Sequence, residues 1–199
     1  LKKLKIDISE VINAAKTKPF GFMPFYPGPG YGGHCIPVDP YYFIWLAKKF
    51  KINSKFIELS GKINNSIPEW ICKQIKIELK KKSQKIKKSK ILILGIAYKK
   101  NINDDRESPA YKLIEILLRK YNCTVSFYDP YINKIQIKNS KKFNNRSIKL
   151  EEKKLKSFDF GILVTDHDSI DYQKIKKNIK FIFDTRNLNL LHGKNVIKI

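Results

Sequence analysis

The stretch "KILILGIAY", residues 90–98, decides the fold of this chain. It is a short apolar run that Gly95 interrupts, and such a run is typical of a strand buried on both faces of a sheet. The segment before it, residues 80–90, is rich in lysine and has no apolar face. We therefore expect the chain to change character near residue 82.

Further apolar runs follow this strand. They are "CTVSFYDP" (residues 123–130), "FDFGILVTDH" (158–167) and "KFIFDT" (180–185). Ser108 and Pro109 begin an amphipathic pattern that predicts a helix to about residue 121. Strands that alternate with helices predict an α/β fold with a parallel, Rossmann-like sheet over residues 83–199. Residues 133–157 are rich in lysine and asparagine, and we assign no elements to them.

Residues 1–82 have helical patterns instead. We expect helices over residues 7–16, 39–50, 53–63 and 66–82. Asp7, Asp39 and Ser66 are the expected N-caps, because their short oxygen-bearing side chains accept hydrogen bonds from the first free N–H groups. The chain therefore divides into a helical part, residues 1–82, and an α/β part, residues 83–199.

The net charge of +23 points first to nucleic acid as a partner. However, 37 of the 41 basic residues are lysines and only 4 are arginines, and the lysines are scattered. A protein that reads bases uses more arginine, whose fork fits the guanine edge. We therefore expect a solvated basic surface and no specific nucleic-acid partner.

Three cysteines, Cys35, Cys72 and Cys123, lie far apart in the sequence. This spacing implies neither a disulfide framework nor a zinc site, so we expect no metal and a reducing cytoplasm. No apolar run approaches the roughly 20 residues that a membrane span needs. The start, "LKKLKIDISE", lacks the apolar core of a signal peptide and an initiator methionine, so we expect a processed chain or a piece of a longer one.

Polar residues gather where the predicted strands end. The segments are "GIAYKKNINDDRESP", "YDP", "VTDHD" and "DTRN". In open α/β sheets, ligands bind beyond the carboxyl ends of the strands. The sequence therefore predicts a ligand site at this edge of the sheet.

The passage "YPGPGYGGHCIPVDPYYF", residues 26–43, contains a cysteine beside a histidine. A thiolate attacks carbonyl carbon well, and glycines let backbone N–H groups approach a substrate closely, so Cys35 could be a nucleophile with Asp39 handling water or a proton. Cys35 could equally be an inert small residue, and Asp39 is explained as a helix cap. From the residues alone both readings stay open. Cys72 and Cys123 read as structural.

The segment "YKKNINDDRESP", residues 98–109, lies between a strand and a helix. Lys99, Lys100 and Arg106 would favour phosphate near the helix N-terminus, while the acidic residues beside them could be ordinary first-turn and loop charges. Gly95 has no partner glycines at the spacing of a dinucleotide fingerprint. The sequence therefore holds no complete nicotinamide-cofactor site.

Together, "KPFGFMPFYPGPGYGGHCIPVDPYYF", "ILILGIAYKKNINDDRESPAYKLIEIL", "VSFYDPY" and "DTRN" resemble the UDP-glucose/GDP-mannose dehydrogenase family of nucleotide-sugar dehydrogenases. The match is in order and nearly end to end, and "TKPFGFMPFYPGPG" is closest to the branch that oxidises UDP-N-acetylglucosamine at C6. The resemblance implies that residues 1–82 are the family's central helical dimerisation domain. Residues 83–199 would be its C-terminal UDP-sugar-binding domain.

The resemblance also implies roles for single residues. Cys35 matches the nucleophile that holds the substrate as a thiohemiacetal and then a thioester, and Asp39 matches the residue that assists water and proton transfer. Arg106 matches a contact on the NAD side. The substrate contacts would be Phe25, Tyr26, Pro27, Gly28, Gly32, Tyr98, Lys99 and Arg186. Val38 departs from members that carry a lysine there near NAD.

The resemblance further implies an N-terminal NAD-binding domain that this sequence does not contain. The implied activity is NAD-dependent oxidation of a UDP-sugar C6 alcohol to the uronic acid, for polysaccharide biosynthesis, with this chain inactive by itself. The implied partners are a UDP-sugar and a second copy of the chain, and no membrane. The alternative is a non-catalytic remnant that only dimerises and binds UDP-sugar.

Overall fold

The computed structural model describes residues 4, 6–137, 141–188 and 193–199. Its strands form one five-stranded sheet in the order β2-β1-β3-β4-β5, and every neighbouring pair is parallel. The strands are β1 (Lys90–Leu94), β2 (Thr124–Tyr128), β3 (Phe160–Leu163), β4 (Ile182–Asp184) and β5 (Val196–Lys198). The predicted parallel α/β fold is confirmed.

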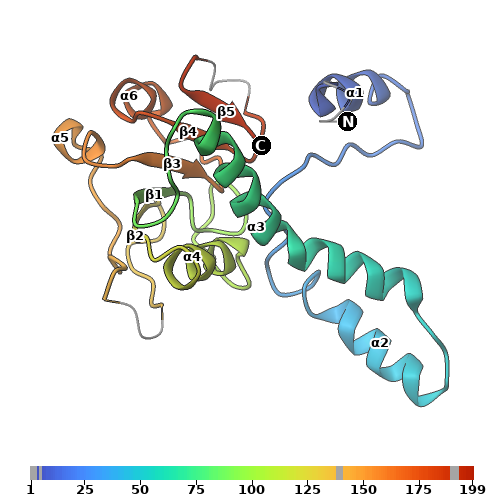
Figure 1. Ribbon diagram of the computed structural model, residues 1–199. Helices are drawn as coiled ribbons and strands as arrows, with labels where there is room; N and C mark the ends of the chain where they lie inside the picture. Colours follow the sequence, from blue (N-terminus) through green and yellow to red (C-terminus); the bar gives the residue numbers. More distant parts are fainter. Residues whose placement is uncertain (1–3, 5, 138–140, 189–192) are drawn as a thin grey trace.

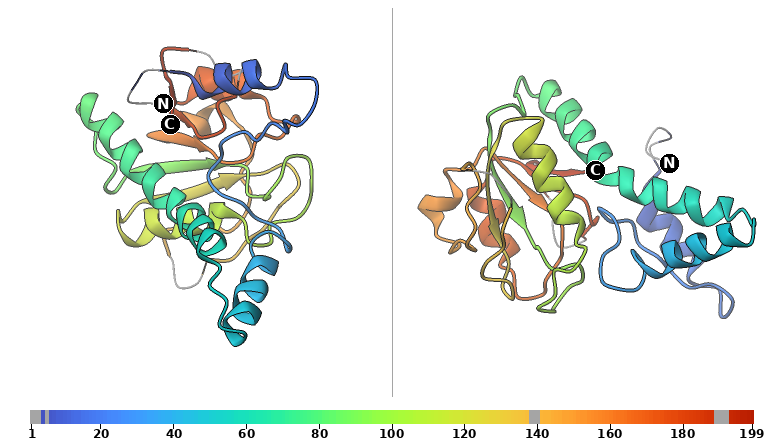
Figure 2. Two further views of the ribbon diagram at one scale, coloured as in Figure 1. Left: turned by 90° about the vertical axis from the view of Figure 1, so that its right-hand side faces the viewer. Right: turned by 90° about the horizontal axis from the view of Figure 1, so that it is seen from below.

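Helices cover both faces of this sheet (Figure 2). On one face, α3 (Lys55–Lys81) and α4 (Pro109–Arg119) share a buried apolar cluster with β1 and β2. On the other face, α5 (Glu152–Leu155) and α6 (Tyr172–Asn178) pack in a second cluster with β3 and β4. Strands buried on both faces explain the continuous apolar runs of the sequence.

The helix α3 is one long helix where we expected two. It runs through Ser66, whose hydroxyl donates to the carbonyl of Ile63 at 2.7 Å, so Ser66 is not an N-cap. Pro68 lies inside the helix and gives no backbone N–H. Tertiary packing overrides this local break, because the second half of α3 buries Ile71, Ile75 and Leu79 against the sheet.

The first half of α3 extends away from the sheet beside α2 (Asp39–Lys49), as Figure 1 shows. Asp39 is the first residue of α2, and the N-cap position falls on Val38, which makes no side-chain cap. The expectation that Asp39 caps this helix is therefore wrong by one residue, and Pro40 lies within its first two positions. The α3 helix thus joins the helical hairpin to the α/β layers.

The short helix α1 (Ile8–Ala15) begins as predicted, because the side chain of Asp7 accepts a hydrogen bond from the N–H of Ser9 at 2.8 Å. Asp7 also accepts from the amide of Asn187 at 3.0 Å and pairs with Lys198 at 3.2 Å. These contacts tie α1 to the C-terminal edge of the sheet. Residues 17–38 then lead to α2 without a regular element.

Two regions were not predicted in detail. The strand β5 has three residues and was missed. In the segment 133–157, described except for residues 138–140, the elements are α5 and isolated bridges such as Val125 with Phe143. No helix in the described part of the chain is long and apolar enough to cross a membrane.

Candidate functional site

The site is built around the loop that follows β1, residues 95–107, which we call the Tyr98 loop. The loop starts at Gly95, with φ of +84°, where an added Cβ would lie 2.4 Å from the carbonyl oxygen of Thr165. Only glycine suits such a left-handed, close approach. Because β1 and β3 are neighbours here and the strand order reverses between them, the loop begins at the topological switch point of the sheet.

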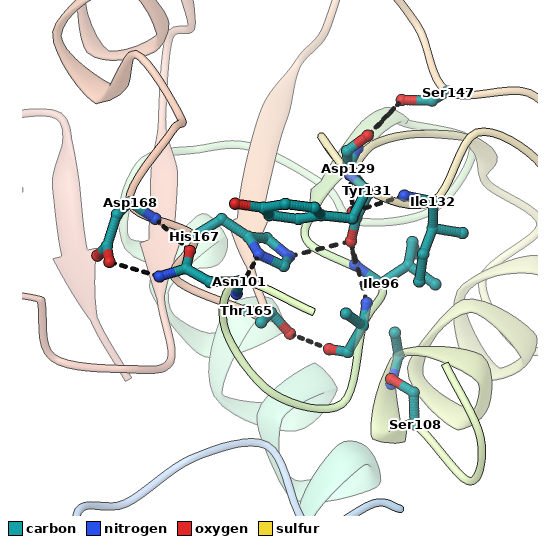
Figure 3. Close-up of polar contacts among 12 residues, drawn as sticks. Ile96, Asn101, Ser108, Asp129, Tyr131, Ile132, Ser147, Thr165, His167 and Asp168 are labelled. Carbon is teal, nitrogen blue, oxygen red and sulfur yellow. Dashed lines mark hydrogen bonds and ion pairs between the residues drawn. The ribbon is translucent and has the colours of Figure 1, made fainter. Parts of the chain in front are cut away.

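Asp129, at the end of β2, fixes the start of this loop (Figure 3). One carboxylate oxygen accepts from the backbone N–H groups of Ile96 at 2.6 Å and Ala97 at 3.0 Å. The other accepts from those of Tyr131 at 2.8 Å and Ile132 at 2.9 Å. Asp129 is 1% exposed, so these bonds replace the water that the buried charge has lost.

His167 completes this buried network (Figure 3). Its Nε2 lies 3.1 Å from the carboxylate of Asp129, and its Nδ1 accepts from the backbone N–H of Asn101 at 2.9 Å. Burial raises the pKa of Asp129, but the bonds from His167 and the backbone N–H groups lower it more, to about 2. Asp129 is therefore an anion at neutral pH.

The segment that carries Cys35, residues 26–38, lies against the Tyr98 loop, and we call it the cysteine loop. The N–H of Gly33 donates to the carbonyl of Arg106 at 2.8 Å. A Cβ on Gly32 would lie 2.5 Å from the Cβ of Tyr98, and one on Gly33 would lie 3.0 Å from the Tyr98 ring. The glycines are thus needed for the two loops to pack closely.

A second contact joins the cysteine loop to the end of β4. A Cβ on Gly28 would lie 2.3 Å from a guanidinium nitrogen of Arg186. The Nε of Arg186 pairs with Asp166 at 3.1 Å, and its backbone N–H donates to the buried carboxylate of Asp184 at 2.8 Å. Burial raises the pKa of Asp184, while hydrogen bonds from the backbone N–H groups of residues 186–188 oppose the rise. Arg186 is thus held both at its backbone and at its guanidinium.

Cys35 is exposed, one turn before Asp39, whose N–H donates to the Cys35 carbonyl at 2.8 Å. Arg106 is nearby and is held by Asp104, with a shortest distance of 2.6 Å. The hydrogen bond with Asp104 raises the pKa of Arg106, and Tyr98 and Cys35 raise it further when ionised. The same pair lowers the pKa of Asp104 to about 2. Cys35 therefore lies within electrostatic range of the Arg106–Asp104 ion pair.

The other two cysteines lie in the core. Burial raises the pKa of Cys72 to about 12 and that of Cys123 to about 11. Thiols with such pKa values stay protonated at neutral pH and react slowly, so the structure separates one accessible thiol from two inert ones.

The structure brings several predicted residues together and leaves others at the surface. Gly28 meets Arg186, and Gly32 meets Tyr98. By contrast, Phe25 and Tyr26 are 78% and 50% exposed, and Pro27, Asp39 and Lys99 are exposed as well. A cavity of about 680 Å³ borders Pro27 and Gly28, and its walls include Trp70, Thr185 and Asn187.

Sequence reasoning did not single out Asp129 and His167. Their segments, "YDP" and "VTDHD", were noted as polar strand ends at the expected ligand edge. What the sequence could not show is that strand order 2-1-3 places the ends of β2 and β3 on either side of the Tyr98 loop. The polar strand ends were visible in the sequence, but the pairing of Asp129 with His167 depends on the strand order.

A parallel sheet with polar loops at its switch point is the arrangement in which open α/β proteins bind their ligands, and an exposed cysteine is docked against these loops. The sequence matches the UDP-glucose/GDP-mannose dehydrogenase family, UDP binding domain, over residues 92–189 and the central domain of the same family over residues 1–66. This chain belongs to the UDP-glucose/GDP-mannose dehydrogenase family.

Relatives with known names agree. The chain is 36% identical over 170 residues to a UDP-N-acetyl-D-mannosamine dehydrogenase of Methanococcus vannielii, covering 81% of this chain and 36% of the relative. It is 32% identical over 138 residues to a UDP-N-acetyl-D-glucosamine 6-dehydrogenase of Salmonella typhi, covering 68% and 31%. The family prediction is therefore confirmed, and relatives named for either amino sugar are found.

Solved structures show the same likeness. The structure of a UDP-D-ManNAc dehydrogenase from Pyrococcus horikoshii aligns with a TM-score of 0.79 at 30% identity, over 98% of this chain and 44% of that one. The native Cap5O structure from Staphylococcus aureus aligns with a TM-score of 0.71 at 28% identity. This chain thus spans less than half the length of the relatives that it matches.

Proposed function

We propose that this chain supplies the UDP-sugar-binding and covalent part of an NAD-dependent nucleotide-sugar 6-dehydrogenase. The observation that carries the proposal is the double docking of the cysteine loop, through Gly33 on Arg106 and through Gly28 against Arg186. It brings an exposed thiol to the edge of the sheet where ligands of this fold bind. Family membership supports the reaction class.

The substrate would lie along the two loops. Arg186 offers a guanidinium to the diphosphate, a geometry that suits bidentate recognition. Tyr98, Lys99 and Gly32 would contact the sugar and diphosphate from one side, and Phe25, Tyr26, Pro27 and Gly28 from the other. The names of the relatives favour an N-acetylated amino sugar on UDP.

Cys35 would carry the covalent step. After the C6 alcohol is oxidised to the aldehyde, the thiolate adds to the aldehyde carbon, and the former carbonyl oxygen takes up a proton to give a thiohemiacetal. Loss of a second hydride and a proton gives a thioester, and water then releases the acid and restores the thiol. Asp39, one turn from Cys35, would assist the water and the proton transfers. A free, exposed thiol of this kind suits a reducing cytoplasm.

Two molecules of NAD would each accept one hydride, one for each oxidation. In this chain Arg106 would contact this cofactor, and its guanidinium is already bonded to Asp104. The Tyr98 loop, which follows β1, has no further glycines at dinucleotide-fingerprint spacing. We therefore propose that NAD is bound mainly by a part of the enzyme outside this sequence, and that this chain alone does not reduce NAD.

The helical hairpin would form a dimer. The helix α2 with its C-cap residue, and the first half of α3, expose large apolar side chains, among them Phe43, Trp45, Phe50, Phe56, Leu59 and Ile63. Exposed apolar side chains that gather on one hairpin are typical of a protein–protein contact surface. We expect the chain to sediment as a dimer, and Phe56→Asp, at a side chain 84% exposed, to give folded monomer. A monomeric wild-type chain would contradict this part of the proposal.

Calorimetric titration of the purified chain with UDP-N-acetylglucosamine tests the function. We expect saturable binding that ADP-glucose does not reproduce. Arg186→Ala should weaken it about 10-fold or more, the usual effect of losing a hydrogen bond to a charged group. Arg119→Ala, which removes the same charge from the far end of α4, is the matched control. Equal binding of both sugar nucleotides, or none, would contradict the proposal.

A further inference from the structure

We propose that His167 and Asp129 are positioning residues that set the Tyr98 loop, and through it the cysteine loop, for substrate. The inference deepens the proposed function and rests on it. Neither residue would touch the UDP-sugar in this account. Asp129 would act through backbone N–H groups that precede Tyr98, and His167 through one that follows it.

The spacing of these contacts supports the inference. Asp129 accepts from the N–H groups of Ile96 and Ala97, and His167 accepts from that of Asn101, so the anchored positions bracket Tyr98 and Lys99. Both anchoring side chains are 0% exposed. Buried hydrogen bonds of this kind are hard to exchange for water, so the loop has little freedom between its anchors.

The two ring nitrogens of His167 have different tasks. Because Nδ1 accepts from the Asn101 N–H, it carries no proton, and the proton therefore lies on Nε2 and is donated to Asp129. The ring thus links Asp129, at the end of β2, to Asn101, which follows Tyr98 in the Tyr98 loop. Tyr131 packs against it with ring centroids 5.1 Å apart and restricts its rotation.

The position of Tyr98 is passed on to the cysteine loop. Its side chain lies directly against the backbone of Gly32 and Gly33, and Arg106 at the end of the same loop accepts from the Gly33 N–H at 2.8 Å. Cys35 follows two residues later. A shift of the Tyr98 loop would therefore move the thiol and the substrate contacts together.

The other side-chain contacts on this loop are either exposed or limited to one side of Tyr98. Lys100 and Asn101 bond Asp168, whose side chain is 67% exposed, so water competes for these bonds. Thr165 donates to the carbonyl of Ala97 at 2.5 Å but does not reach beyond Tyr98. The His167–Asp129 pair is the buried connection between the residues before Tyr98 and Asn101 after it.

Two conservative variants separate the two nitrogens. His167→Asn places an amide oxygen near the position of Nδ1, so it keeps the acceptor for Asn101 and loses the donor to Asp129. His167→Gln reaches the position of Nε2 and does the reverse. Tyr172→Phe is the matched control, because the Tyr172 hydroxyl donates only to the main-chain carbonyl of His167 at 2.9 Å.

Amide hydrogen exchange and UDP titration are measured on the same samples of the whole chain. We expect both His167 variants to speed exchange at the Gly33 N–H beyond any change in global stability, and only His167→Gln to speed it at Asn101. Both should weaken UDP binding by about 3- to 10-fold, the effect of one lost hydrogen bond. Tyr172→Phe should change neither quantity.

The inference is overturned if Gly33 exchange in both variants changes only as much as global unfolding does. It is also overturned if UDP binds both variants within twofold of wild type. If UDP fails to bind the wild-type chain, the proposed function fails, and the positioning of the cysteine loop is then decided by Gly33 exchange alone.

Discussion

Asp129→Ala is expected to lower the free energy of unfolding by about 3–5 kcal/mol, the cost of breaking a buried ionic network from one side. The change leaves four backbone N–H groups and the Nε2 proton of His167 buried without their acceptor. Water cannot replace the carboxylate, because Asp129 and His167 are 1% and 0% exposed. Urea unfolding at pH 7, followed by circular dichroism, measures the change.

Glu69→Ala is the control for this variant. Glu69 pairs with Lys73 and Lys120, but its side chain is 48% exposed. Removal of such a surface carboxylate should change stability by about 1 kcal/mol or less. Equal losses of unfolding free energy in Asp129→Ala and Glu69→Ala would contradict the claim that the buried network stabilises the fold more than a surface ion pair does.

The pH dependence supplies a second check on Asp129. Its pKa of about 2 in the folded chain lies below the ordinary value of 3.8, so folding favours its charged form. The stability that it contributes is therefore present above about pH 4 and is lost as the pH falls through about 2. The difference in the free energy of unfolding between wild type and Asp129→Asn should therefore decrease as the pH falls from about 4 to about 2.

Cys35→Ala is expected to abolish acid formation, with a loss of more than about 10³-fold, because no thioester can form without the thiol. This chain would be joined to the remaining N-terminal part of the Pyrococcus horikoshii relative, since the two structures align over 98% of this chain. The assay follows NADH and the uronic acid product from UDP-N-acetylglucosamine or UDP-N-acetylmannosamine.

Cys72→Ala is the matched control in the same chimera. Cys72 is a buried thiol in the apolar cluster under α4, so its loss should lower stability while the folded fraction keeps its activity. Full acid formation by the Cys35→Ala chimera would contradict the role of Cys35. An inactive chimera with Cys35 intact would instead contradict the proposed division of labour between the two parts.

Much of the fold could be predicted from the sequence because the strands are buried on both faces. The apolar runs around Ile93, Phe127 and Ile162 are short and continuous, which is the pattern of such strands, and all three residues are buried. The helix α3 was divided wrongly because Pro68 and Ser66 are strong local stop and start signals. Packing of Ile71 and Ile75 against the sheet overrides them, and that packing is a long-range property.

The candidate site could be predicted only in part. The motifs around Cys35 and Arg186 carry the family resemblance, and local chemistry accounts for the glycines of the first and the arginine of the second. The pairing of Asp129 with His167 joins residues 38 apart in sequence. It depends on strand order, which no local pattern in either segment specifies. Contacts such as Gly28 against Arg186 depend on the same long-range geometry.

The most direct test of the central claim is the rate at which iodoacetamide modifies Cys35 in the native chain, with and without UDP-N-acetylglucosamine. Cys72 and Cys123 are buried, so mass spectrometry should find the modification at Cys35. We predict that saturating UDP-N-acetylglucosamine slows this modification about tenfold or more in the wild type, because the bound sugar covers the thiol, and that Arg186→Ala loses most of the protection at the same concentration. An unchanged rate in the wild type, at a concentration where calorimetry shows saturation, would contradict the claim that the sugar binds at Cys35.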